Sequence, residues 1–217
     1  MRHINFISNI IKSILFPGNL TYGYDVALIF LKEDAILNDN VQLASLPQSN
    51  QDCPPGNSLT LSGWGTDPTI PRCPPHCTPH NALWAVKQEC LDIEECDRFG
   101  SLTDKNIILC VGDKTNPRNS GFKGDSGGKF KMRYLSVEIS SCICKVFFFN
   151  IAMITFIRKP TLGPLTFSDD SGERTIFGIV SGPGNVPFWP IETTAFARVS
   201  HPKILDWIKN TMNSYLK

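Results

Sequence analysis

This chain of 217 residues has no long apolar run and no large excess of positive or negative charge. The longest largely apolar run, residues 146–157, is much shorter than the ~20 residues of a membrane-spanning helix, so we expect no membrane association. The spacing of apolar residues in this run does not distinguish a buried strand from a buried helix. Lys and Arg number 21 against 20 Asp and Glu, without a basic run, which argues against nucleic acid as a partner.

The features of a secretory leader are lacking as well. Four polar residues interrupt the apolar positions at the start of the chain, and no small-residue cleavage site follows; they are Asn5, Ser8, Asn9 and Lys12. We therefore expect no signal peptide within these residues.

The composition, 41% hydrophobic with 16 Gly and 16 Pro, is typical of a turn-rich all-β protein. Buried strands are expected over residues 26–31, 58–64, 83–87, 107–111, 176–182 and 195–199, and a short helix or turn over 91–99. The chain should end in an amphipathic helix. Ser200 can cap that helix, Pro202 suits its first turn, and an apolar face repeats at near-helical spacing; the face comprises Ile204, Leu205, Ile208 and Met212.

Glycines surround one serine in the segment Gly124-Asp125-Ser126-Gly127-Gly128. A serine hydroxyl attacks a carbonyl only with the help of a base and of N–H groups aimed at the developing oxyanion. The flanking glycines let the backbone turn tightly and come close to a substrate. Alone, such a segment is also compatible with a surface turn, so its context decides.

Four further segments flank this one in a fixed order, and together they carry a family resemblance. They are Tyr24-Asp25-Val26-Ala27-Leu28-Ile29, Ser62-Gly63-Trp64-Gly65, Ile176-Phe177-Gly178-Ile179-Val180-Ser181-Gly182 and Ala195-Phe196-Ala197-Arg198-Val199. With the serine segment and the terminal helix, the chain resembles the chymotrypsin-like (S1) serine proteases over roughly residues 10–128 and 163–214. The resemblance implies two antiparallel β-barrels with an active site between them.

Carried over residue by residue, the resemblance makes Ser126 the nucleophile and gives the oxyanion hole to the N–H groups of Gly124 and Ser126. Asp25 matches the acid that orients the catalytic histidine. In the family template the acid precedes the serine by ~93 residues, and here the separation is 101. Loop variation accounts for a difference of that size.

No histidine matches the third member of the triad. The template places it ~45 residues before the acid, whereas only 24 residues precede Asp25. The four histidines, at positions 3, 76, 80 and 201, are better interpreted as solvated or structural. The family's activating N-terminus, which pairs with the acid matched by Asp125, has no counterpart either. We therefore expect the chain as given to be inactive or nearly so, with a non-catalytic homologue that binds partners as the alternative.

The resemblance divides residues 1–214, a partial peptidase domain, into two parts. Residues 1–37 match a remnant of the first barrel, and residues 52–214 match the second barrel. A half-barrel exposes unpaired strand edges, which favours aggregation.

Residues 128–162 interrupt the family pattern. Removing them joins Gly-Asp-Ser-Gly-Gly to Pro164-Leu165-Thr166-Phe167, which restores the family's continuation. The codons for Gly128-Lys129-Phe130 can contain a splice-donor sequence, and those for Leu162-Gly163 an acceptor. We interpret the segment as a translated intron, with a genuine insertion as the alternative. Sequencing transcripts across the junction distinguishes the two.

Eight cysteines suit an oxidising compartment. The resemblance implies a disulfide between Cys96 and Cys110. Leu59 and, after the removal of 128–162, Phe167 stand where the family pairs two cysteines, so packing can replace that bond. Cys53, Cys73, Cys77 and Cys90 lack family counterparts, and their pairing stays open.

A metal site is one interpretation of Cys73-Pro-Pro-His-Cys77 with His80. The three-residue gap and the two prolines favour a Pro-rich surface loop instead. We expect no metal and no cofactor.

The specificity pocket can be assigned by alignment with the family pattern. Ser120 falls at the floor of this pocket, and Ser181, Pro183 and Thr194 fall along its walls. The uncharged floor and narrowed walls predict a preference for small apolar side chains in a peptide or protein substrate. The resemblance also implies a secreted, monomeric protein.

Overall fold

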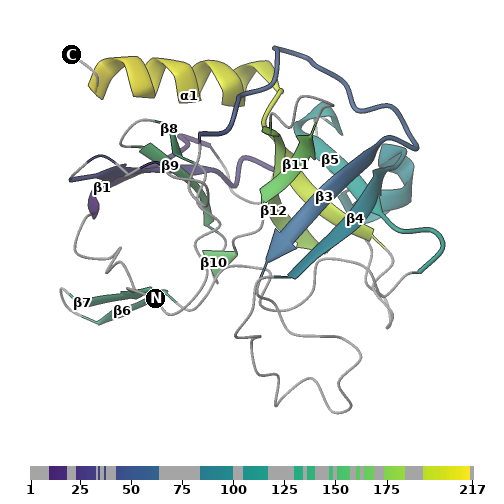
Figure 1. Ribbon diagram of the computed structural model, residues 1–217, viewed down its shortest axis with the longest axis horizontal. Helices are drawn as coiled ribbons and strands as arrows, with labels where there is room; N and C mark the ends of the chain where they lie inside the picture. The colour runs from purple at the N-terminus through teal and green to yellow at the C-terminus, as the bar shows by residue number, and fades with distance from the viewer. Residues whose placement is uncertain are drawn as a thin grey trace.

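A closed antiparallel barrel forms one half of the protein (Figure 1). The computed structural model describes residues 10–18, 23–32, 34, 37, 43–63, 84–99, 105–116, 130–133, 136–139, 147–148, 151–156, 160–161, 164–168, 174–183 and 193–215. The barrel runs in the order β11-β12-β13-β5-β4-β3, and β11 pairs with β3 to close it. Its strands are β3 (Ser58–Gly63), β4 (Trp84–Cys90), β5 (Ile108–Gly112), β11 (Pro164–Ser168), β12 (Arg174–Pro183) and β13 (Thr193–Arg198).

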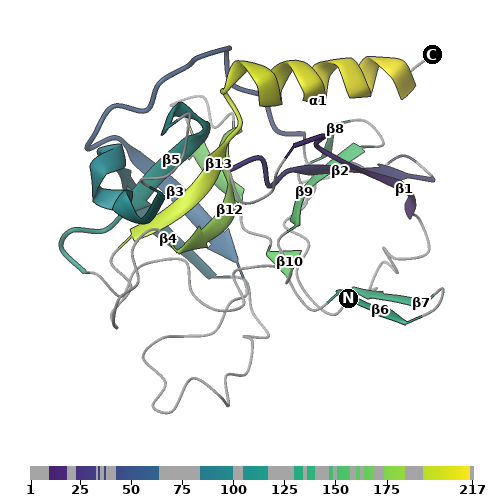
Figure 2. The ribbon, with the colours of Figure 1, turned by 180° about the vertical axis from the view of Figure 1, so that it is seen from behind.

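A second, open sheet lies beside the barrel. It runs β1-β2-β9-β10, and β8 also pairs with β9. Its strands are β1 (Ile10–Leu15), β2 (Ala27–Leu31), β8 (Phe147–Phe148), β9 (Ile151–Phe156) and β10 (Pro160–Thr161). A hairpin of β6 (Phe130–Arg133) and β7 (Ser136–Ile139) forms a two-stranded sheet of its own. The views from front and back both show this hairpin apart from the barrel (Figures 1 and 2).

Two short 3-10 segments connect β4 to β5: η3 (Ile93–Phe99) and η4 (Lys105–Ile107). The expected short helix over 91–99 is thus confirmed as a 3-10 element. The six strands expected from the sequence are confirmed too, and their ends are shifted by one or a few residues. For example, β4 continues to Cys90, because its residues keep pairing with β3 as far as Glu89 opposite Ser58.

The terminal helix α1 (Pro202–Tyr215) bridges the two sheets. As predicted, Ile204, Leu205 and Ile208 are its buried residues. Ile204 and Ile208 share one apolar cluster with Val26 and Leu28 of the open-sheet side and with residues of the barrel. The helix therefore covers the junction between the open sheet and the barrel.

The far end of α1 is fixed to the open sheet by aromatic contacts. The rings of Phe30 in β2 and Tyr215 lie with centroids 4.1 Å apart. The Lys12 ammonium contacts the Tyr215 hydroxyl and lies 4.8 Å from the centre of its ring. These contacts hold the C-terminal turn of the helix against β1 and β2 (Figure 2).

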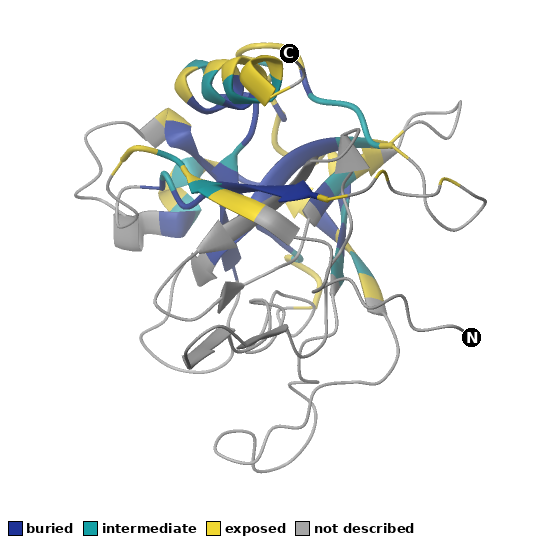
Figure 3. Ribbon diagram, turned by 90° about the vertical axis from the view of Figure 1, so that its left-hand side faces the viewer, coloured by how far each residue is buried: buried dark blue, intermediate teal, exposed yellow. Residues whose placement is uncertain are grey.

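Large apolar side chains fill the barrel, and one glycine lets two strands approach closely. Phe196 of β13 is fully buried between Leu59, Leu165 and other members of a second apolar cluster. A Cβ atom at Gly178 of β12 would lie 2.8 Å from the Cβ of Phe196, so no larger residue fits there without a shift. Dark blue strands in the side view mark this buried interior (Figure 3).

Phe167, which the resemblance matches to a family cysteine, contributes packing instead. Its ring lies edge-on to Phe177, with centroids 6.1 Å apart, and it is 38% exposed. Leu59, at the other cysteine place, is buried. The pairing of Thr166 with Thr60 sets these two positions next to each other in the register of β11 and β3.

Among the described residues, two disulfides crosslink the barrel half. Cys96 bonds to Cys110, as the resemblance implied, with Cα atoms 5.9 Å apart. Cys53 bonds to Cys90, with Cα atoms 6.0 Å apart. This second bond ties the segment that enters the barrel to the end of β4. Its pairing could not be predicted from the sequence.

Removing each disulfide by a double Cys→Ala substitution should destabilise the protein in the order of loop length. In the chain-entropy model, the loop of 37 residues closed by Cys53 and Cys90 is worth about 4 kcal/mol, and the loop of 14 closed by Cys96 and Cys110 about 3 kcal/mol. Urea unfolding of both variants measures the losses. Losses below about 1 kcal/mol for both would contradict the assignment of these bonds as structural staples.

Candidate active site

Asp25 is fully buried and lies two residues before β2, directly after a tight turn. Gly23 in that turn has φ +85°, which favours glycine, and a Cβ there would lie 2.7 Å from the Ile108 side chain. The Val26 N–H donates to the Tyr24 carbonyl over 2.9 Å. The turn therefore holds the carboxylate inside the protein, at the junction of the open sheet and the barrel.

An aromatic frame fixes the turn around Asp25. The Tyr24 ring stacks on Phe16, with centroids 4.8 Å apart and planes within 2°. Phe16 in turn meets the Trp207 ring of α1 edge-on at 5.2 Å. These contacts fix the backbone next to Asp25 between the open sheet and α1.

The predicted wall residues of the specificity pocket come together at the end of the β12–β13 pair. Pro183 lies directly opposite Thr194 in the register, and Gly182 opposite Ala195. Ser181 and Thr194 are buried, at 8% and 1% exposure. The Cys96–Cys110 disulfide lies beside this wall, because Cys110 pairs with Ala195 on the neighbouring strand.

The serine segment lies outside the described residues. Ser126, Gly124 and the predicted pocket floor, Ser120, all fall there, as does Asp125. Their assigned roles, as nucleophile, oxyanion hole and pocket floor, therefore stay predictions. Of the predicted site residues, the structure thus places Ser181, Pro183 and Thr194 on neighbouring strands and Asp25 two residues before β2, and their roles in the pocket and the triad stay predictions too.

His201 precedes α1 and is buried as part of the scaffold. Its ring meets that of Tyr24 edge-on, with centroids 6.4 Å apart, and its carbonyl accepts the N–H of Leu205 in the first turn of the helix. The other three histidines lie outside the described residues.

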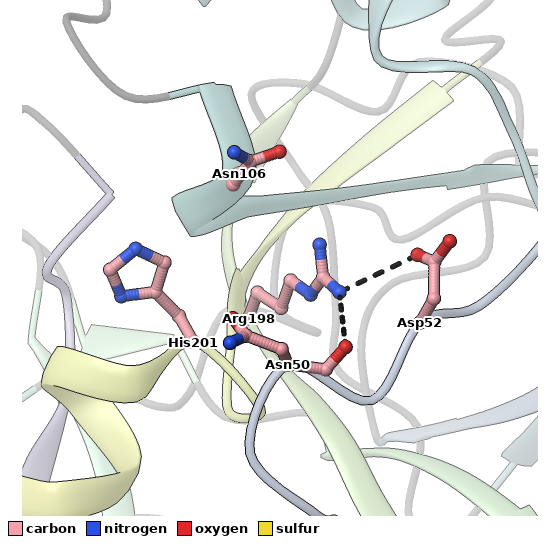
Figure 4. A pocket seen from close by; sticks show the side chains of 5 residues that line it. All are labelled: Asn50, Asp52, Asn106, Arg198 and His201. Atoms are coloured by element: carbon pink, nitrogen blue, oxygen red, sulfur yellow. Dashed lines mark hydrogen bonds and ion pairs between the residues drawn. The ribbon is translucent and has the colours of Figure 1, made fainter.

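A polar cavity of about 300 Å³ opens next to His201 (Figure 4). The Arg198 guanidinium crosses it to the segment that precedes β3, donating to the Gln51 carbonyl over 3.1 Å and to the Ser200 hydroxyl over 2.9 Å. It also lies 3.4 Å from the Asp52 carboxylate. Sequence reasoning missed this tether, since only the fold brings residues 51 and 198 together.

Two negative findings apply to the described part of the chain. No helix there is long and apolar enough to span a membrane. No three potential metal-ligating side chains gather there, and Cys73, Cys77 and His80 lie outside it.

Known proteins provide a direct comparison with these features. The family model described as Trypsin matches residues 7–132, more than half of the chain. Mast cell protease 8 of Mus musculus is 31% identical over 65% of this chain and 56% of its own length. The chymase of Papio hamadryas is 34% identical over 55% of this chain and 46% of its own length. Human chymotrypsin-like elastase family member 3A is 28% identical over 89% of this chain and 56% of its own length.

The closed six-stranded barrel, the terminal helix and the disulfides define a chain with the architecture of a trypsin-like domain. The chain belongs to the trypsin-like (S1) family of serine proteases. It spans about half the length of the curated relatives that it matches. The matched residues include both Asp25 and the Gly-Asp-Ser-Gly-Gly segment.

Proposed function

We propose that this chain derives from a serine endopeptidase in which Ser126 attacks the peptide carbonyl. The N–H groups of Gly124 and Ser126 bind the oxyanion, and Asp25 orients the base. One observation carries the proposal: a single family match spans the buried acid and the serine segment in the family's order. The rigid turn at Gly23 supports the role of Asp25.

The chain by itself is proposed to be inactive or nearly so, because no histidine in it stands at the family's spacing ahead of Asp25. Without a base, the Ser126 hydroxyl keeps its proton near neutral pH. The loss of one triad member leaves only a residual ~10³–10⁴-fold rate enhancement over water. Even this residue depends on a formed oxyanion hole.

The positions of the barrel strands in the sequence support the proposed domain division. All six of them lie outside 128–162, and the barrel resumes at Pro164, where β11 begins. The family match ends at residue 132, shortly after Gly128. Both observations support residues 128–162 as a segment foreign to the family pattern, most simply a translated intron. We propose that residues 52–214, apart from this segment, make up the second barrel and that residues 1–37 belong to the first.

Substrates of the complete enzyme are proposed to be proteins with a small apolar residue before the cleaved bond. Ser120 adds no charge to the pocket floor. The opposed Pro183 and Thr194 support a narrowed wall, because both side chains exceed glycine in size. No cofactor is needed for this acyl transfer, and the protein is proposed to act as a monomer.

The two disulfides support an oxidising, extracellular compartment as the place of action. A second candidate function is that of a non-catalytic homologue that binds proteins or regulates them. Retention of the whole Gly-Asp-Ser-Gly-Gly segment favours the enzyme origin over this alternative.

Peptidase assays on the full chain test the proposal. We expect hydrolysis of an alanine peptide ester at a rate equal to that of the Ser126→Ala variant, since the hydroxyl has no base. Labelling of Ser126 by a fluorophosphonate should be correspondingly slow. Rapid hydrolysis that Ser126→Ala abolishes would overturn the proposed inactivity and establish a base elsewhere.

A further inference from the structure

Both edges of β2 are paired in this chain, and the two partners come from distant parts of the sequence. β1 pairs along one edge, from Leu15 opposite Ala27 to Ile10 opposite Leu31. β9 pairs along the other edge, with Ala27 opposite Ile154, Leu28 opposite Met153, Ile29 opposite Ala152 and Phe30 opposite Ile151. The unpaired edge expected of a half-barrel is therefore covered at β2.

The covered strand is central to the packing of this half of the protein. All five residues of β2 are buried, at 5% exposure or less. Leu28 and Phe30 pack in the cluster that includes Ile204 and Ile208 of α1. An exposed edge here would leave a row of N–H and C=O groups unpaired beside a buried apolar strand, at a substantial cost in free energy.

The covering strand comes from the segment that interrupts the family pattern. Its sequence, Ile-Ala-Met-Ile-Thr-Phe, has no charge, no glycine and no proline and is rich in β-formers. By contrast, β6 and β7 of the same segment pair only with each other among the described residues. Among the described residues of this segment, therefore, β9 pairs with the rest of the protein, whereas β6 and β7 pair only with each other.

We propose that the edge of β2 opposite β1 is a strand-accepting site whose occupant is residues 151–156, and that the stability of the first sheet depends on this strand. The site takes an extended, apolar, uncharged strand in antiparallel orientation, bound through its main chain. The inference concerns stability and stands apart from the proposed catalytic ancestry. A foreign segment has in this way become a structural part of the protein.

Proline scanning of the two parts of the segment tests the proposal. Because successive N–H groups of a strand point to opposite sides, proline is placed at two adjacent positions in turn, Ala152→Pro and Met153→Pro. The matched controls are Lys131→Pro and Met132→Pro in β6. Hydrogen exchange of the β2 amides and urea unfolding are measured on each full-length variant.

At least one β9 variant should accelerate exchange of the β2 amides by about tenfold or more, the factor that corresponds to one net hydrogen bond. Both β6 variants should leave this exchange within about twofold of the parent chain, because β6 makes no pair with β2. Equal effects of the β9 and β6 variants would overturn the proposal.

Exchange in the unaltered chain supplies a test that does not depend on the folding of any variant. The amides of residues 151–156 should include some protected by about 100-fold or more over an unfolded peptide, a protection that a persistent antiparallel ladder provides. If all of them exchange as in an unfolded chain while β2 stays protected, β9 does not occupy the edge and the proposal fails. Neither outcome depends on peptidase activity.

Discussion

Joining an upstream segment that carries the family's histidine loop and activating N-terminus, while removing residues 128–162, should raise the rate of peptide hydrolysis by about 10⁴-fold or more over this chain. The physical reason is that a serine nucleophile, its base and the orienting acid act as a unit. Here the acid is already buried and held by the Gly23 turn. Supplying the base completes the triad. The gain is measured as kcat/KM for an alanine peptide ester.

The control for this gain is Ser126→Ala in the same chimera, which should return the rate to the level of the present chain. Circular dichroism and disulfide mapping establish that the chimera is folded. A folded chimera whose hydrolysis is slow, or is insensitive to Ser126→Ala, would show that position 126 is not the nucleophile. An arginine ester cleaved faster than the alanine ester would refute only the narrow-pocket assignment.

Phe196→Ala should cost about 3–5 kcal/mol of unfolding free energy, the range observed when a fully buried phenylalanine is truncated. The ring is completely buried in the barrel, and the close approach of β12 at Gly178 leaves the neighbouring backbone little room to collapse into the cavity. Urea unfolding followed by tryptophan fluorescence measures the loss.

A matched control is Phe167→Ala in the same barrel. Its ring is 38% exposed and makes an edge contact with Phe177, so its removal should cost clearly less, about 1–2 kcal/mol. Equal losses of unfolding free energy for the two variants would show that Phe196 is not the centre of the barrel core. A loss for Phe167→Ala above the expected range would show that its packing stabilises the barrel more than its exposure indicates.

The spacing of apolar residues along the sequence predicted individual strands and the terminal helix. The buried run 26–31 became β2, and the face formed by Ile204, Leu205 and Ile208 became the buried side of α1. The helix begins at Pro202, the residue that the sequence assigned to its first turn. Family order added the Cys96–Cys110 bond, which spacing alone leaves open.

Long-range partners could not be predicted in this way. Cys53 and Cys90 meet because the entry segment folds back along β4, and no local pattern marks this meeting. Arg198 reaches Gln51 only across the closed barrel. The choice of β9 as neighbour of β2 depends on which edges the rest of the chain leaves open, since periodicity could not distinguish strand from helix for residues 151–156.

The most direct measurement is the distance between the Ser126 hydroxyl and the Asp25 carboxylate in an experimentally determined structure of this protein. If a shared ancestry in peptide-bond cleavage is right, both groups face the same crevice between the open sheet and the barrel, with room for one imidazole ring between them. A serine on the opposite side of the molecule from the buried acid would contradict that ancestry.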